Sequence, residues 1–188
     1  MLQLRTERLL LVAATLELAQ AELTNRSRFE TLLAAHVPPH WPPPLNDENS
    51  IRWTVERLKA DPAAAGWYAW YFLHREHEQK IAVGNGGFTG RPAPDGMVEV
   101  GYSIVPDYHR LGLAPEAVRG LIGWAFGHRE VSRVVAHTLP NLVPSIRVLE
   151  KCGFALVGPG AEEGTVRYAL ERAAHERAKS AAVRRPRG

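Results

Sequence analysis

The sequence contains a single cysteine, Cys152, and no run of about 18 apolar residues that could cross a membrane. One cysteine cannot form an internal disulfide, which excludes a disulfide-stapled scaffold and fits a reducing compartment. The opening, Met1 to Arg5, lacks the charged-then-apolar layout of a secretory signal. These absences predict a cytoplasmic protein that does not associate with membranes.

The composition is that of a folded globular chain. Its 188 residues fit one domain, and 45% hydrophobic with 23% charged residues exclude global disorder. The excess of basic groups lies at the C-terminal end. The chain has 23 Lys and Arg against 20 Asp and Glu, but residues 171–188 hold six of the basic and only two of the acidic groups. The remaining body has a net charge close to zero, so it is not expected to bind nucleic acid.

The Ala- and Arg-rich segment 171–188 is expected to be a basic tail, frayed or disordered. Association of this tail with nucleic acid stays an alternative function, and such binding would weaken strongly with salt.

The order of apolar patterns predicts an α/β domain. Strands are expected at residues 4–12, 67–73, 81–88, 97–105, 133–138, 154–158 and 165–170. Helices are expected at residues 16–23, 29–35, 47–61, 115–128 and 144–151. Short polar connections among the three middle strands favour antiparallel neighbours, whereas the later strand–helix–strand order favours a crossover. Together these elements predict a layered α/β domain with a mixed sheet.

A proline-rich loop interrupts this pattern. Residues 36–44 contain five prolines around Trp41, and prolines remove the backbone donors that a helix or a central strand needs. The loop is either a packed structural arch or a wall of a binding cleft.

Residues 98–117 are the most informative segment, because a strand runs into a tight loop that opens a long helix. Gly112 and Ala114 have little or no side chain, and Pro115 suits the first helical position. Amides at a helix N-terminus bind phosphate or pyrophosphate, and Arg110 adds a positive charge. The segment matches neither a Walker loop nor a dinucleotide fingerprint.

Residues 109–114, His-Arg-Leu-Gly-Leu-Ala, resemble the phosphate loop Gln/Arg-x-x-Gly-x-Gly/Ala of the GNAT superfamily of N-acetyltransferases, with His109 in the first place. Residues 138–154 resemble a second family block, Asn-x-x-Ser followed by Leu-Glu-Lys and Gly-Phe. That block, with the opening residues 4–9, is most similar to the branch of ribosomal-protein N-terminal acetyltransferases (RimJ/RimL-like). The resemblance covers about residues 2–170, so residues 1–170 are expected to form the GNAT-like domain.

The resemblance implies a mixed, mostly antiparallel sheet splayed between two parallel central strands, with helices on both faces. It also implies acetyl-CoA as cosubstrate and a primary amine as acceptor, either a protein N-terminus or a small molecule, with a homodimer possible and no metal.

The resemblance further implies which residues hold the coenzyme. Backbone amides at Ser103 and Ile104 would bind the pantetheine arm and polarise the thioester carbonyl, and Asn141 would bond the same arm. The diphosphate would lie on the main chain of Arg110, Leu111, Gly112, Leu113, Ala114 and Pro115.

Two side chains are candidates for catalysis. Glu99, on the strand that enters the site, is the expected base for the amine, and its alternative is an ordinary solvated strand carboxylate. The resemblance to the ribosomal-protein branch implies Ser145 as the donor to the leaving thiolate, and its alternative is a capping residue of its helix. Many family members have a tyrosine where this chain has Leu149. An acyl-CoA-binding module without turnover therefore remains an alternative.

Overall fold

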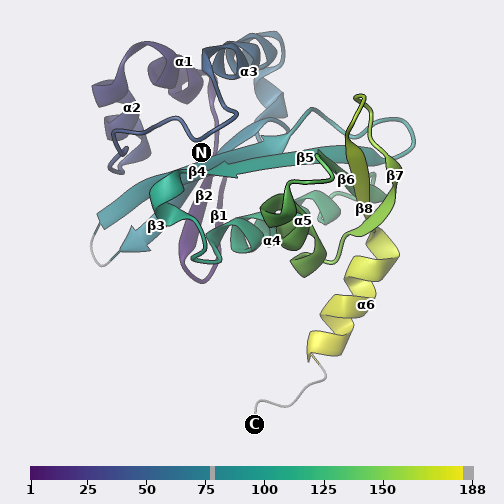
Figure 1. The fold of residues 1–188 in the computed structure, drawn as a ribbon. Helices are drawn as coiled ribbons and strands as arrows, with labels where there is room; N and C mark the ends of the chain where they lie inside the picture. Colours follow the sequence, from purple (N-terminus) through teal and green to yellow (C-terminus); the bar gives the residue numbers. More distant parts are fainter. Residues whose placement is uncertain (77–78, 184–188) are drawn as a thin grey trace. The chain divides into compact units, whose positions relative to one another are not determined.

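The computed structural model describes residues 1–76 and 79–183 (Figure 1). The chain divides into two compact units. The first unit comprises Met1–Arg91 and Gly101–Leu121. The second comprises Pro92–Val100 and the chain from Ile122 onward. Strand β5 (Met97–Ile104) and helix α4 (Leu113–Phe126) each contribute residues to both units.

The first unit is built on strands hydrogen-bonded in the order β1-β2-β3-β4-β5. Besides the end of β5, these are β1 Gln3–Arg5, β2 Leu9–Ala13, β3 Ala69–Glu76 and β4 Gln79–Phe88. The pairs from β1 to β4 are antiparallel. The single strand expected at residues 4–12 is thus two strands, because Thr6 hydrogen-bonds back to Leu9 and turns the chain.

Three helices pack against this part of the sheet and form the core of the first unit. They are α1 Leu16–Thr24, α2 Arg26–Leu33 and α3 Glu48–Ala60, followed by a short 3₁₀ turn at Pro62–Ala64. Leu18, Phe29 and Leu58 from the helices and Tyr71 from β3 are buried together. The side chains of Thr15 and Asp47 cap α1 and α3 by accepting from Leu18 N and Ser50 N.

The proline-rich loop packs on this core. Trp41 lies against the rings of Phe29 and Tyr71, with ring centroids 6.0 and 6.3 Å apart. Its indole Nε1 donates to Glu22 Oε1 at 2.9 Å. These contacts favour the packed arch among the two interpretations of the loop.

The second unit contains strands in the order β5-β6-β8-β7. Besides the start of β5, these are β6 Arg133–Thr138, β7 Ala155–Pro159 and β8 Val166–Glu171. Its helices are α5 Val143–Lys151, α6 Arg172–Val183 and the end of α4. Strands β5 and β6 are parallel, with Met97–Glu99 opposite Arg133–Val135, and the other pairs are antiparallel. The predicted α/β class with a mixed, mostly antiparallel sheet is confirmed.

The segment expected to be a basic tail contains the end of a strand and a helix. Glu171 ends β8, helix α6 follows, and residues 184–188 lie outside the described part of the chain. Arg172 donates to the carbonyls of Phe126, His128 and Val131 at 2.6 to 2.9 Å, so it binds the C-terminal end of α4. In residues 1–76 and 79–183, no helix has the length and apolar character to span a membrane.

Candidate active site

The loop between β5 and α4 folds as a tight reversal. A 3₁₀ turn at Pro106–Tyr108 follows the strand, and then Arg110 (φ 63°) and Gly112 (φ 76°) both adopt the left-handed conformation. Glycine tolerates this conformation freely, but arginine does not, so the fold holds Arg110 in place against a local cost. Arg110, Leu111 and Gly112 are exposed, which leaves this turn open to a ligand.

Helix α4 begins at Leu113, two residues before the start that Pro115 predicts. Pro115 still lies in the first turn, where an N–H would have no intrahelical acceptor, so its missing donor costs nothing. The first-turn amides and the positive end of the helix dipole therefore face the loop.

His109 closes the base of the loop. Its ring Nε2 donates to the carbonyl of Ile104 at 2.8 Å, because a carbonyl oxygen can only accept. The histidine that replaces Gln or Arg in the resembled motif thus ties the loop to the end of β5.

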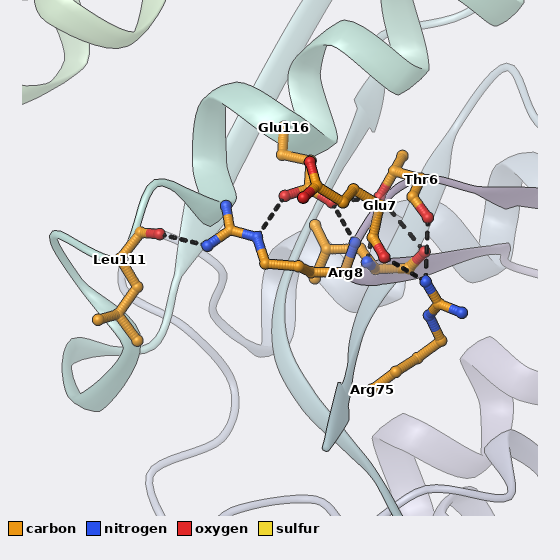
Figure 2. Close-up of polar contacts among 7 residues, drawn as sticks. Thr6, Glu7, Arg8, Arg75, Leu111 and Glu116 are labelled. Atoms are coloured by element: carbon orange, nitrogen blue, oxygen red, sulfur yellow. Dashed lines mark hydrogen bonds and ion pairs between the residues drawn. The ribbon is translucent and has the colours of Figure 1, made fainter. Parts of the chain in front are cut away.

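Arg8 supports the loop from the β1–β2 turn (Figure 2). Its Nη1 donates to the carbonyl of Leu111 at 2.8 Å, and its Nε donates to Glu116 Oε2 at 2.7 Å. Glu116, in the first turn of α4, also accepts from Thr6 Oγ1 at 2.6 Å and from the backbone N–H of Arg8 at 2.7 Å. Burial alone would raise the pKa of Glu116, but the hydrogen bonds from Thr6 and Arg8 and the charge of Arg8 outweigh it and lower that pKa.

At the end of β5 the backbone of Ser103 faces β4. A Cβ atom on Gly84 would overlap the Ser103 carbonyl, and Val105 N–H donates to the Val83 carbonyl at 2.9 Å. Backbone groups of successive strand residues point to opposite sides, so the N–H of Ile104 faces away from β4. The hydroxyl of Ser103 donates to the Pro44 carbonyl at 2.6 Å. Of the two expected amides, Ile104 is thus the one that points away from the neighbouring strand.

Glu99 belongs to a chain of three polar side chains in the second unit. His137 Nδ1 lies 2.9 Å from Glu99 Oε1, and Arg167 Nε donates to His137 Nε2 at 3.0 Å. Because Nε2 accepts, the proton of a neutral His137 is on Nδ1, and it is donated to Glu99. Glu99 keeps 36% of its side chain exposed, against 15% for His137. It is therefore a hydrogen-bonded and partly exposed carboxylate rather than a freely solvated one.

Sequence reasoning missed His137 and Arg167. They are partners in the β6–β8 register, yet thirty residues apart in the chain. The alternation of side chains along β6 and along β8 could have assigned each residue to one face of the sheet. Their contact, however, requires knowing that β6 and β8 are neighbouring strands.

Asn141 and Ser145 lie at the start of α5. Asn141 is exposed in the turn that precedes the helix, and Ser145 is half-buried as the third helical residue. The N-cap residue is Leu142, whose own side chain makes no capping bond. Both interpretations of Ser145, leaving-group donor and capping residue, stay predictions. Leu149, in the place of the family tyrosine, is 1% exposed.

His74, near the end of β3, is paired with a neighbouring carboxylate. His74 Nδ1 bonds Glu76 Oε1 at 2.9 Å, and His77 lies outside the described part. Within residues 1–76 and 79–183, no three or more His, Cys, Asp and Glu side chains are grouped to hold a metal ion.

Comparison with known proteins identifies the family. Residues 8–155 match the acetyltransferase (GNAT) domain family. An uncharacterized N-acetyltransferase of Bacillus subtilis, YjdG, is 29% identical over 86% of this chain and 95% of its own length. The chain therefore belongs to the GNAT acetyltransferase family. Membership makes it an acyltransferase of a family that uses acetyl-CoA.

Solved structures share the fold. A putative ribosomal-protein-serine acetyltransferase from Vibrio cholerae superposes with a TM-score of 0.61 at 23% identity, over 90% of this chain and 97% of its own. The aminoglycoside acetyltransferase AAC(6')-Ib, solved with coenzyme A, superposes with a TM-score of 0.60 at 19% identity, over 91% of this chain and 99% of its own. The two neighbours act on different acceptors, so likeness of fold does not select one.

Proposed function

We propose that this protein transfers an acetyl group from acetyl-CoA to a primary amine by direct attack within a ternary complex. The observation that carries the proposal is the exposed turn between β5 and α4, with left-handed Arg110 and Gly112 before a helix N-terminus. Such a turn offers main-chain amides and a helix dipole to a diphosphate. The single cysteine supports a cytoplasmic setting.

The coenzyme contacts follow from the same turn. The main chain of residues 110–115 binds the diphosphate, and the exposed guanidinium of Arg110 adds charge. The N–H of Ile104 polarises the thioester carbonyl, while Ser103 fixes the strand end through Pro44. Asn141, exposed before α5, bonds the pantetheine arm.

Glu99 acts as the base and Ser145 as the donor to the leaving group. An amine is protonated near neutral pH, so Glu99 removes a proton, directly or through water, before the nitrogen attacks the carbonyl carbon. The C–N bond forms and the C–S bond breaks. The Ser145 hydroxyl hydrogen-bonds the departing thiolate, which becomes the free thiol with the second proton that the acetylated nitrogen loses, while the proton on Glu99 returns to solvent. No covalent acyl-enzyme is required.

The acceptor class is a protein N-terminus or a small-molecule amine. A protein acceptor and a small-molecule acceptor are both named among the fold neighbours, in the putative ribosomal-protein-serine acetyltransferase and the aminoglycoside acetyltransferase. A screen of peptides, polyamines, amino acids and aminoglycosides for thiol release from acetyl-CoA decides between them.

A second candidate function is an acyl-CoA-binding module without turnover. Leu149 favours it, because a buried leucine cannot protonate a thiolate. Calorimetric binding of acetyl-CoA without thiol release over the whole amine panel would favour this module and overturn the transferase proposal.

The role of Glu99 has its own test. Glu99→Gln should lower kcat about a hundredfold and remove the limb of the pH–rate profile that belongs to the base, with the Kd of acetyl-CoA unchanged. Glu163→Gln, on an exposed loop of the same unit, is the matched control. An unchanged rate and profile in Glu99→Gln would exclude it as the base.

A further inference from the structure

Arg8 connects the β1–β2 turn to a distant part of the chain, which comprises residues 105–112 between β5 and α4 (the coenzyme loop) and the first turn of α4 that follows them (Figure 2). One edge of its guanidinium holds Glu116 through Nε, and Nη1 holds the Leu111 carbonyl. The backbone of Arg8 bonds the same carboxylate. The segment Thr6–Leu9 belongs to the opening that resembles the family, but no role in the reaction has yet been assigned to it.

We propose that Arg8 is a positioning residue for coenzyme binding, which sets the direction of the Gly112 amide by holding the Leu111 carbonyl. The inference rests on the proposed function, since it requires that the loop binds the diphosphate of acetyl-CoA.

The geometry of the peptide bond carries the argument. The Leu111 carbonyl and the Gly112 N–H belong to one planar trans peptide, so they point in opposite directions. With the carbonyl fixed on Arg8, the Gly112 N–H points away from Arg8 and from the β1–β2 turn. A Cβ added to Gly112 would lie 3.4 Å from Arg8 Nη2, which places the guanidinium directly beside this peptide.

The loop needs such support because its own conformation is costly. Arg110 is left-handed, a conformation that non-glycine residues adopt only against steric strain. Without Arg8, the exposed peptide of Leu111 and Gly112 would be free to rotate. Binding would then have to order a mobile loop, which weakens affinity.

A positive charge alone cannot hold the Glu116 carboxylate and the Leu111 carbonyl at the same time. Arginine presents donors in a rigid fork and can hold a carboxylate and a carbonyl at once, whereas lysine is a flexible point charge. Arg8→Lys therefore separates the bridging role from simple attraction between a cation and the phosphates.

Arg75 supplies a matched control on the same turn. Its Nη2 donates to the carbonyls of Thr6, at 3.1 Å, and Glu7, so it secures the β1–β2 turn without contacting the coenzyme loop (Figure 2). Arg75→Ala should lower the melting temperature and leave coenzyme affinity within twofold of the wild type.

The experiment is calorimetric titration of the full chain with acetyl-CoA and with S-acetylpantetheine, which lacks the diphosphate. Arg8→Ala and Arg8→Lys should both raise the Kd of acetyl-CoA about tenfold. Their Kd for S-acetylpantetheine should match that of the wild type. A purely structural role of Arg8 would not produce this difference between the two ligands. If Arg8→Ala does not fold, Arg8→Lys, which keeps the charge and the aliphatic stem, carries the test.

Three results would overturn the inference: wild-type affinity in Arg8→Lys, equal losses for both ligands, or a Kd in Arg75→Ala raised as much as in Arg8→Ala. Each leaves acetyl-CoA binding by the wild type intact, so the proposed function survives. If the wild type binds acetyl-CoA but releases no thiol, acetyl transfer fails and the positioning role is still decided by the Kd values. If the wild type does not bind acetyl-CoA, both proposals fall.

Discussion

Glu116 and Glu22, two carboxylates of the first unit, each tie a loop to the scaffold, but with different partners. Glu116 anchors the support of the coenzyme loop and accepts from Thr6 and from the guanidinium of Arg8. Glu22 anchors the proline-rich loop and accepts from Trp41 Nε1 at 2.9 Å and Tyr71 Oη at 2.7 Å.

The difference in partners appears in the pKa values. Burial raises the pKa of Glu22 to about 7, and the hydrogen bonds from Tyr71 and Trp41 offset this only in part. Burial also acts to raise the pKa of Glu116, yet the donors around it, Arg8 included, bring it below the ordinary value. At Glu22 the effect of burial on the pKa is larger than its two neutral donors offset, whereas at Glu116 the Thr6 hydroxyl, the backbone N–H of Arg8 and the guanidinium of Arg8 together outweigh it.

The largest effect is expected on removal of the paired carboxylate. Glu116→Ala removes the acceptor of Arg8 Nε, of the Arg8 backbone N–H and of the shorter hydrogen bond of the Thr6 hydroxyl, at a cost of about 3 kcal/mol in the free energy of unfolding. Urea unfolding at pH 7 measures it.

The control for Glu116→Ala is Glu17→Ala. Glu17 pairs with Arg28, and both side chains are more than half exposed, so less than about 1 kcal/mol is expected. Equal losses in the two variants would show that the Arg8–Glu116 pair is an ordinary surface pair and would break the comparison.

A smaller change in stability, of opposite sign, is expected when the charge of Glu22 is removed. Because folding raises the pKa of Glu22 from 4.5 to about 7, the folded state binds its proton more tightly than the unfolded state. This contribution to stability is complete below pH 4.5 and is lost as the pH rises through 7. Glu22→Gln removes the buried charge, so it should stabilise the protein by about 2 kcal/mol at pH 8 and by much less at pH 4.

Urea unfolding of Glu22→Gln and wild type across pH 4 to 8 tests this sign. Glu17→Gln, an exposed carboxylate on the same helix, should leave the pH dependence unchanged. If Glu22→Gln were less stable than the wild type at pH 8, the charged form of Glu22 would be favoured by its two donors, and the contrast with Glu116 would disappear.

Local patterns in the sequence were sufficient for the turn and for the helices expected at residues 16–23 and 47–61. Gly112 and Ala114 before a helix predicted an open loop, and Thr15 and Asp47 cap the helices expected there. Alternation along residues 97–101 placed Glu99 apart from the buried Val98 and Val100. Each of these features depends on residues only a few positions apart.

The supporting contacts depend on partners distant in the sequence. Arg8 and Glu116 are 108 residues apart, and no period or motif relates them. Arg172 looked like part of a loose basic tail by composition, yet it bonds the carbonyl of the last residue of α4 and two carbonyls of the segment that follows. The partners of these charged side chains are therefore set by the strand order and the helix packing, which the local sequence does not reveal.

The smallest expected effect concerns the donor from the proline-rich loop. Trp41→Phe keeps an aromatic ring beside Phe29 and Tyr71 but removes the Nε1 hydrogen bond to Glu22. That bond lowers the pKa of Glu22, so its loss should raise this pKa further and cost about 1 kcal/mol at pH 8. Below pH 4.5 the carboxyl is neutral and the cost should be smaller. Thermal unfolding at the two pH values measures how the cost of Trp41→Phe depends on pH. When Trp41→Phe is added to Glu22→Gln, its cost should be the same at both pH values. A cost independent of pH would mean that Trp41 contributes through ring packing alone, so that the loop is held by its aromatic contacts and not by the carboxylate.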